Sequence, residues 1–334
     1  MTTQHTLDEA VPVASQSPRG PQRTSQHRPG SNRHWRKPSP VVVFVAILAL
    51  AGVALLQLPS IATWFSQLEY SREIMELNQA SSGGDTEGRE AALAAAHDYN
   101  ARLNGAAIVG AGERIPKAED VASGNDYDQL LAADSTGLMA RIKIPSIDVD
   151  LPIYHGTSDE VLKQGVGHLE GTALPVGGDT THTVLTGHRG LAQAELFDNL
   201  DRVGKGDTFT VEVFGDVLTY RVTNTQVVAP DETQSLFPVQ GKDLATLVTC
   251  TPLGINTHRI LVTGERVLPT PARDVESAGQ DPTVPGFPWW VLWLASATLV
   301  IGGYVVLSCR TTTKEAPVEA APPPTRAPKH MRVS

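Results

Sequence analysis

Two uncharged apolar stretches, one near each end of the chain, constrain its fold more than any other feature. Residues 41–58 form a run of 18 residues without a charge, and residues 287–309 form a run of 23. A helix needs about 20 apolar residues to cross the hydrocarbon core of a bilayer, so both runs are long enough. Three tryptophans lie near the start of the second run, as is typical of a membrane interface. We therefore expect a protein of the cell membrane with two transmembrane helices and a folded domain between them.

The distribution of charge predicts how these spans are oriented. Residues 1–40 hold six Lys and Arg against two carboxylates, and residues 310–334 hold five against two. Since these tails contribute +4 and +3 to a net charge of −9, the residues between them carry −16. Basic flanks stay on the cytoplasmic side, so we expect both termini in the cytoplasm and residues 59–286 outside the cell. The long basic leader and the second span argue against a cleaved signal peptide.

Composition divides the chain further. The tails 1–40 and 310–334 lack the apolar content needed to fold and are predicted to be disordered. Residues 59–104 predict an extracellular helical segment, whose two helices, 66–79 and 89–104, are separated by a Gly-containing stretch. The remaining expected segments are an acidic connector at 105–137, a catalytic domain at 138–268, a linker at 269–286 and the second span at 287–309.

From Gly137 onward the pattern becomes strand-like. Residues 208–214, for example, alternate apolar and polar side chains, which is typical of half-buried antiparallel strands. A short helix is expected at about 192–200. Many short strands with few helices indicate a mainly β fold, either a closed barrel or a sandwich. The expected strands are 139–147, 149–154, 183–187, 208–214, 217–228, 244–249 and 259–267.

Cys250 is the only cysteine expected outside the membrane. Cys309 falls at the cytoplasmic end of the second span, so no disulfide joins the two, because bridged Cα atoms must come within about 7 Å. An unpaired thiol in an exported domain is unusual. Cys250 follows one expected strand and Arg259 opens the next, a layout that indicates a cysteine nucleophile. The alternative is a small buried hydrophobic residue.

A thiol nucleophile also needs a proton carrier and a group that stabilises the oxyanion. His188 ends an apolar strand and enters a glycine-flanked turn, where reactive groups are often presented; His155 and His168 also lie beside glycines and remain alternatives. Arg259 cannot act as a base, so its role would be charge stabilisation or substrate clamping, unless it forms a structural ion pair. Its neighbour His258 points to the opposite strand face. The histidines expected outside the membrane are His97, His155, His168, His182, His188 and His258.

The run Leu247-Val248-Thr249-Cys250, with Arg259 on the next strand and Thr186-Gly187-His188 upstream, resembles the signature of the sortases. The wider stretch 151–266 is similar to class C sortases, the pilin polymerases, which also carry two spans around an exported barrel. The resemblance covers about residues 60–310. It implies a closed eight-stranded sortase-type β-barrel with short helices, preceded by the helical segment.

The resemblance also implies a cysteine transpeptidase without a cofactor or metal. Cys250 would attack the Thr–Gly bond of an LPxTG-like sorting signal on a pilin or surface protein, forming a thioacyl enzyme. His188 would protonate the departing amine and then deprotonate the acceptor, a lysine of another pilin subunit or a wall-precursor amine. Arg259 would hold the carbonyl or the oxyanion, with Thr249 as a further oxyanion or substrate contact.

Class C sortases usually carry a lid with an Asp-Pro-aromatic motif, which this connector lacks. Asp126 and Tyr127 are candidate lid residues, and a solvated acidic linker is the alternative. Zinc-type Cys-x-x-Cys spacing, a phosphate loop and a dinucleotide fingerprint are absent from the sequence, and the acidic middle argues against nucleic acid as a partner. The competing functions are a housekeeping sortase that anchors surface proteins, a plain cysteine peptidase, and a catalytically silent membrane-tethered scaffold.

Overall fold

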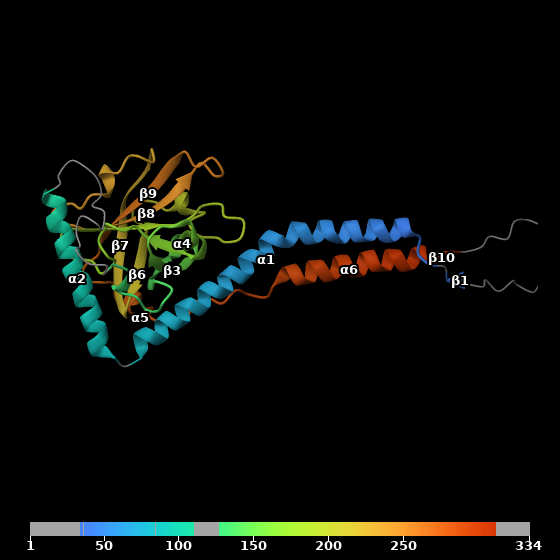
Figure 1. Cartoon of the computed structure of the whole chain (residues 1–334), viewed down its shortest axis with the longest axis horizontal. Coiled ribbons are helices and arrows are strands. Elements are labelled where there is room, and N and C mark those ends of the chain that lie inside the picture. Colours follow the sequence, from blue (N-terminus) through green and yellow to red (C-terminus); the bar gives the residue numbers. More distant parts are fainter. Residues whose placement is uncertain (1–33, 36, 84, 110–126, 312–334) are drawn as a thin grey trace, which may run out of the picture. The chain divides into compact units, whose positions relative to one another are not determined.

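A computed structural model of the chain describes residues 34–35, 37–83, 85–109 and 127–311. Its central feature is a closed eight-stranded barrel with the strand order β2-β3-β4-β5-β8-β9-β7-β6, in which β6 pairs back with β2 (Figure 1). The closed barrel confirms the predicted fold and excludes the sandwich. Its strands are β2 (Leu138–Ile144), β3 (Val149–His155), β4 (Val166–His168), β5 (Thr181–Thr186), β6 (Thr208–Val213), β7 (Asp216–Val228), β8 (Asp243–Thr251) and β9 (His258–Arg266).

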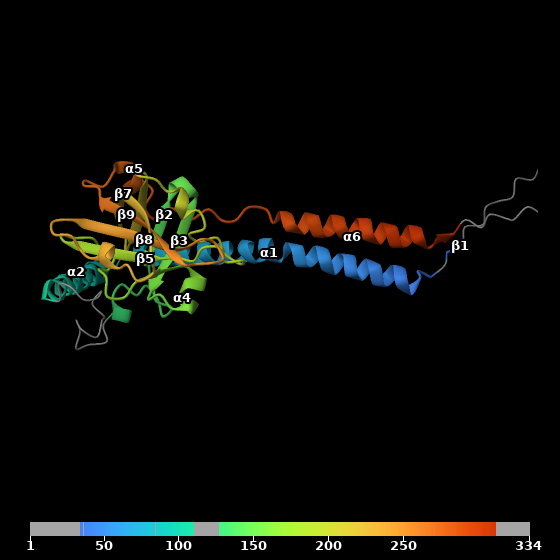
Figure 2. The same ribbon diagram turned by 90° about the horizontal axis from the view of Figure 1, so that it is seen from above.

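Alternation along the strands separates the barrel interior from its outer face, because residues two apart on a strand share a face. Leu185 and Leu247 are register partners on β5 and β8, and both are fully buried in the main core. Val248, one residue out of step, belongs instead to a small outer cluster with Val184 and Leu261. Figure 2 shows β5, β8 and β9 side by side in this wall.

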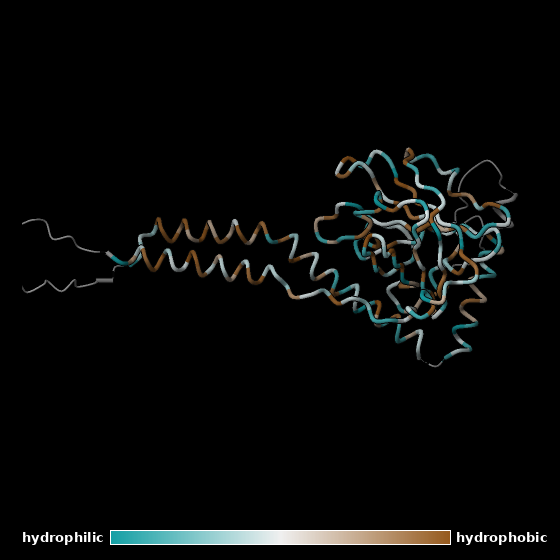
Figure 3. Tube along the Cα trace, turned by 180° about the vertical axis from the view of Figure 1, so that it is seen from behind, coloured by the Kyte–Doolittle hydropathy of each residue, from teal (hydrophilic) through white to brown (hydrophobic). Residues whose placement is uncertain are grey.

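Five α-helices accompany the barrel in the described residues. The expected first span and the expected helix at 66–79 are one continuous helix, α1, which runs through Pro59 without a break. Apolar residues predominate along α6 and the first part of α1 (Figure 3), and both helices are long and apolar enough to cross a membrane. The helices are α1 (Pro40–Ser82), α2 (Thr86–Val109), α4 (Asp159–Gln164), α5 (Ala272–Glu276) and α6 (Trp289–Ser308).

Short elements complete the description. Next to the two apolar helices, β1 (His34–Trp35) pairs antiparallel with β10 (Arg310–Thr311). Within the described segments, four 3-10 turns lie in the connections around the barrel. They are η1 (Tyr127–Gln129), η2 (Pro145–Ile147), η3 (Leu200–Arg202) and η4 (Gln234–Leu236).

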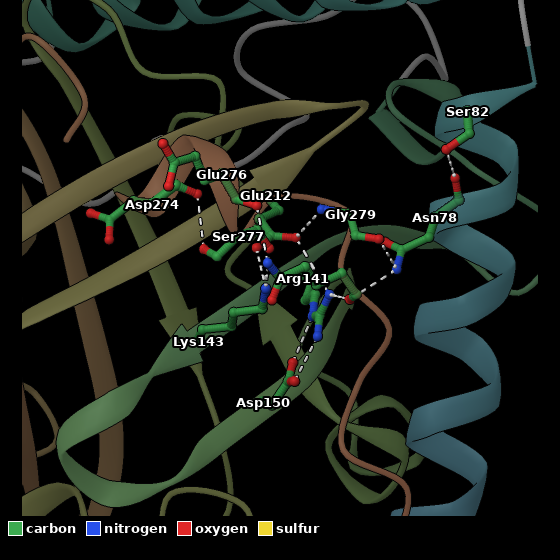
Figure 4. Close-up of polar contacts among 11 residues, drawn as sticks. Asn78, Ser82, Arg141, Lys143, Asp150, Glu212, Asp274, Glu276, Ser277 and Gly279 are labelled. Atoms are coloured by element: carbon green, nitrogen blue, oxygen red, sulfur yellow. Dashed lines mark hydrogen bonds and ion pairs between the residues drawn. The ribbon is translucent and has the colours of Figure 1, made fainter. Parts of the chain in front are cut away.

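The expected linker at 269–286 is fixed to the barrel, and we call it the strap. Arg141 on β2, whose side chain is only 1% exposed, donates from Nη1 to the carbonyl of Gln280 at 2.7 Å and forms a two-pronged ion pair with Asp150 at 2.6 Å. Lys143 donates from Nζ to the carbonyl of Ser277 at 3.0 Å (Figure 4). The buried Arg141 and the partly exposed Lys143 thus hold the strap's backbone carbonyls against the wall of the barrel.

Two further residues, one on the barrel and one on α1, hold the strap from either side. Glu212 on β6 lies 2.6 Å from Lys143 and accepts a hydrogen bond from the amide of Gly279. On the opposite side, Asn78 of α1 donates to the carbonyls of Gly279 and Gln280 at 3.1 and 3.2 Å (Figure 4). The strap is therefore clamped between α1 and the barrel, which the linker prediction did not anticipate.

The helix expected at 192–200 is wrong, since only η3 begins there, at Leu200. The carboxylate of Asp198 accepts the amides of Gly190 and Leu196 at 2.5 and 2.9 Å. Such side-chain bonds to the backbone compete with helical ones and favour turns. The short elements α4 and β4 were not predicted, because three or six residues give too little periodicity to recognise.

Candidate active site

Cys250 lies directly opposite Arg259 in the antiparallel register of β8 and β9. Side chains at paired positions project from the same face, with Cβ atoms about 4.5–5.5 Å apart. Val248 and Leu261, the next pair on this face, belong to the outer cluster, so the thiol and the guanidinium stand outside the barrel core. Both residues are partly exposed. The fold therefore brings a reachable thiol and a cation together at one end of the wall.

His188 leaves the barrel beside Cys250. The last register pair of the parallel strands β5 and β8 is Thr186 with Val248. His188 comes two residues after Thr186, and Cys250 comes two residues after Val248. The backbone continues this alignment, since the amide of Gly187 donates to the carbonyl of Val248 at 3.0 Å. Since β5 ends at Thr186, His188 lies two residues past the strand end, at the same end of the wall as Cys250, and both residues are partly exposed.

Arg259 is not paired with a carboxylate anywhere in the described residues. Its Nη1 donates instead to the carbonyls of Asn256 and His258, at 3.0 and 3.1 Å, in the β8–β9 turn. The structural ion pair considered as an alternative is therefore not formed by the residues that the structure describes. A guanidinium held only by turn carbonyls keeps donors available for a substrate oxygen.

Thr249 faces the other way. It is fully buried, and its Oγ1 donates to the carbonyl of Gly187 at 2.8 Å. The side chain thus joins β8 to the end of β5 on the interior side of the wall. Any contact of this residue with the substrate would have to come from its backbone, and that role stays a prediction.

The alternative histidines are committed elsewhere. His168 is fully buried; its Nδ1 lies 2.8 Å from the Tyr127 hydroxyl and its Nε2 2.9 Å from the carbonyl of Ala173. Burial lowers the pKa of His168 to about 4, a shift that the Ala173 bond opposes and the nearby His155 reinforces. The ring nitrogens of His155 contact the carbonyls of Gly137 and Leu130 at 2.8 and 2.7 Å. These rings hold neighbouring segments together, which leaves His188 as the accessible candidate.

The candidate lid is described only in part. Asp126 lies outside the described residues, whereas Tyr127 begins η1 and is buried. The Tyr127 hydroxyl is engaged by His168 and by the amide of Gly156, which donates to it at 3.0 Å. This tyrosine is thus anchored on β3 and β4, and the lid role of the two residues stays a prediction.

The sequence predicted a glycine-flanked turn after His188, but not the hydrogen bonds that close the loop beyond it. The carbonyl of His188 accepts from the amide of Phe197 at 3.0 Å, and the Asp198 carboxylate holds the amides of Gly190 and Leu196. The glycine after Arg189 was the one available signal, because its φ of +75° is costly for other residues. These hydrogen bonds join the two ends of the loop, so that Phe197 and Asp198 lie next to the backbone of His188 and Gly190.

A cavity of about 320 Å³ lies behind this loop, between α1, the β2–β3 turn and residues 282–286 of the strap. The three candidate catalytic residues do not line it. No group of three or more His, Cys, Asp or Glu is placed to hold a metal ion in the parts of the chain that the structure describes. The chemistry that the site itself supplies is a thiol, an imidazole and a guanidinium, a set suited to acyl transfer.

Comparisons with known proteins agree with this chemistry. The family model of the sortase domain matches residues 142–267. Sortase D of Bacillus subtilis is 30% identical over 129 residues, 38% of this chain and 62% of that protein. The crystal structure of sortase C1 from Streptococcus agalactiae has 42% identity and a TM-score of 0.54, covering 59% of this chain and 98% of that one. Sortase C of Streptococcus pneumoniae, an enzyme with pilin substrates, has 39% identity and a TM-score of 0.51, covering 58% and 95%. The chain thus spans less than two thirds of the curated relative and nearly all of the two crystallised enzymes.

Proposed function

The chain belongs to the sortase family, and we propose that it is a class C-type cysteine transpeptidase acting on LPxTG-like sorting signals. The observation that carries the proposal is the placement of Cys250, Arg259 and His188 at one end of three adjacent strands. The likeness to crystallised sortase C enzymes over nearly their whole length supports the class.

In the first half of the proposed reaction, the thiolate of Cys250 attacks the carbonyl carbon of the Thr in the sorting signal. The Thr–Gly C–N bond breaks, and the acyl group stays on Sγ as a thioester. His188 gives its proton to the departing glycine amine, which is a poor leaving group without one. His188 is thereby left neutral and ready to act as a base.

In the second half, an amine attacks the thioester carbonyl. Only the neutral amine is nucleophilic, so the imidazole of His188 takes the proton that the amine loses. The C–S bond breaks, a new amide forms, and the Cys250 thiolate is regenerated. We infer that the acceptor is a lysine of a second pilin subunit, with a wall-precursor amine as the acceptor that ends polymerisation.

Arg259 would stabilise the negative charge that develops on the carbonyl oxygen in both halves. Its guanidinium exchanges the turn carbonyls of Asn256 and His258 for the substrate oxygen. A pre-positioned donor of this kind contributes about 10²–10³ in kcat. The charge on this residue therefore acts in the transition state and not as a structural ion pair.

The location of the reaction follows from the two candidate spans, α1 and α6. With basic tails on the cytoplasmic side, the barrel would lie outside the cell and its substrates would be exported surface proteins or pilins. Tethering the enzyme to the membrane would hold the thiol near proteins as they emerge.

The experiment is a single-turnover assay with the full-length protein in detergent micelles and a peptide carrying an LPxTG-like signal. Mass spectrometry is expected to detect the acyl adduct on the peptide that contains Cys250. A pilin lysine is expected to release it as an isopeptide, and a wall-precursor amine to do so less efficiently. Release by water alone would reduce the protein to a peptidase, and a better reaction with the wall precursor would assign anchoring instead of polymerisation.

A further inference from the structure

The guanidinium of Arg189 contacts three separate segments at the end of the barrel that carries the candidate site. Its Nη1 donates to Thr251 Oγ1 at 3.2 Å, and its Nε donates to the carbonyl of Asp198 at 3.0 Å. Its Nη2 lies 2.8 Å from Oδ2 of Asp201, and the arginine side chain is 12% exposed. One nearly buried side chain therefore joins strand β8, the end of a loop and the turn η3.

These contacts connect the chain neighbours of the two reacting groups. Arg189 directly follows His188, and Thr251 directly follows Cys250. Past the last register pair of β5 and β8, the hydrogen bond between Arg189 and Thr251 keeps the diverging chains together on the face of β8 opposite the thiol. Two residues earlier on the same face, Thr249 donates to the carbonyl of Gly187, which directly follows β5. The separation of imidazole and thiol is thus set by side chains and not by the backbone ladder alone.

The other two contacts of Arg189, with the Asp198 carbonyl and with Asp201, join the start of the loop after His188 to its end and to η3. The Asp198 carboxylate holds the amides of Gly190 and Leu196, while the Asp198 carbonyl accepts from Arg189. Asp201 neutralises the guanidinium, so Arg189 adds little net charge near the thiol. Its contribution is therefore geometric, and it differs from that of Arg259, which has no carboxylate partner within the described segments.

We propose that Arg189 is a positioning residue for acyl transfer: through Thr251 it fixes the His188 imidazole against the Cys250 thiol. The inference rests on the proposed function, because it concerns the same two reacting groups. A planar guanidinium with five donors is suited to three acceptors in different directions, whereas an ammonium group reaches them only in part. Arginine at this position is explained by that geometry.

Arg189→Gln is expected to lower kcat by about ten- to a hundredfold, because displacements near 1 Å between reacting groups have effects of that size. KM is expected to stay within about twofold, since the residue does not face the substrate. Arg189→Lys keeps the ion pair with Asp201 and is expected to recover part of the rate. Thr251→Val removes only the link to β8 and is expected to lower kcat by about threefold or more.

A second readout needs no substrate. Iodoacetamide alkylation of the full-length protein is measured from pH 5 to pH 9, and peptide mass spectrometry separates the adduct on Cys250 from that on Cys309. Because the thiolate is stabilised by a correctly placed imidazolium, Arg189→Gln and Thr251→Val are expected to slow alkylation at neutral pH and to shift its pH midpoint. A failure of transpeptidation in the wild type would overturn the proposed function and leave this measurement informative.

The matched control is Arg202→Gln, an exposed arginine next to Asp201, for which kcat and the alkylation profile are expected to be unchanged. Melting temperatures are recorded for every variant. Wild-type kcat and alkylation in a folded Arg189→Gln or Thr251→Val protein would overturn the proposal. So would a loss of kcat that tracks only a lower Tm while the alkylation midpoint stays in place. If Arg189→Gln does not fold, Thr251→Val decides.

Discussion

Cys250 on β8 and Arg259 on β9 are register partners in the wall of the barrel. The neighbouring His258 pairs with Thr251 instead and is exposed. Since adjacent strand residues point to opposite faces, the barrel selects the arginine and not the histidine as the partner of the thiol. This pairing determines which substitutions should stop the reaction and which should not.

Replacing the thiol tests the nucleophile. Cys250→Ala is expected to abolish both the acyl adduct and peptide cleavage, because no other group supplies the covalent step. Cys309→Ala is the control, since Cys309 follows α6. The measurement is the rate of sorting-peptide cleavage by the full-length protein. Residual turnover in Cys250→Ala would show that the reaction does not pass through this cysteine.

Replacing the cation tests oxyanion stabilisation. Arg259→Gln is expected to reduce kcat/KM by about 10²–10³, the usual effect of removing one such donor. The matched control, His258→Gln, changes the exposed neighbour and is expected to retain wild-type kinetics. Equal losses in the two variants would point to a disturbed β8–β9 turn in place of a specific role for the guanidinium.

Replacing the imidazole tests proton transfer. His188→Gln is expected to lower kcat by about 10²–10⁴, and small amines of low pKa added as acceptors should recover part of the second half-reaction. His97→Gln, on the exposed face of α2, serves as the control. The rates are followed by stopped assays of adduct formation and release. An unaffected His188→Gln enzyme would move the search for the base to another residue.

The buried His168 predicts how stability depends on pH. Its pKa in the folded protein is lowered to about 4 by burial, and an unfolded histidine titrates near 6.5. Between these values the unfolded state binds more protons, so stability is full above pH 6.5 and falls as the pH drops toward 4. We expect the low pKa of His168 to reduce the free energy of unfolding by about 2 kcal/mol when the pH drops from 7 to 5.

Denaturant unfolding of the full-length protein in micelles at pH 7 and at pH 5 measures the slope of the unfolding free energy against pH. His168→Gln should make the slope shallower without removing it, because burial lowers the pKa of His182 in the same direction. His97→Gln should leave it unchanged. An unaltered slope in His168→Gln would mean that other groups cause the acid sensitivity.

The clamp on the strap predicts a large effect of a buried arginine. Arg141→Met leaves Asp150 and Glu212 without their shared cation and is expected to destabilise the protein by about 3–5 kcal/mol. Arg273→Met, whose side chain is 73% exposed in its pair with Asp274, is expected to cost less than about 1 kcal/mol. Chemical unfolding measures both. Hydrogen exchange of the strap amides should accelerate only in the Arg141 variant, and similar exchange in both would exclude the clamp.

Most strands could be predicted because their signal is local. Residues 208–214 alternate with a period of two, and β6 begins at the predicted residue. The three-residue β4 was missed, since its pairing with β3 and β5 is the only feature that defines it. The helix expected at 192–200 did not form, because the Asp198 carboxylate binds the backbone amide of Leu196, inside that range, and also that of Gly190, just before it.

The sequence by itself determined the family signature, the two apolar stretches that are candidate membrane spans and the residue types of the candidate site, since motif spacing and composition are properties of short segments. The tertiary structure alone decided which residues meet. The strand register places Arg259 opposite Cys250. Packing around the barrel buries His155 and His168, and the fold of the loop after His188 lets Arg189 donate to Thr251. It also converts an expected linker into a clamped strap through Arg141. These relationships join residues far apart in the chain, and no local pattern encodes a contact that only the closed barrel creates.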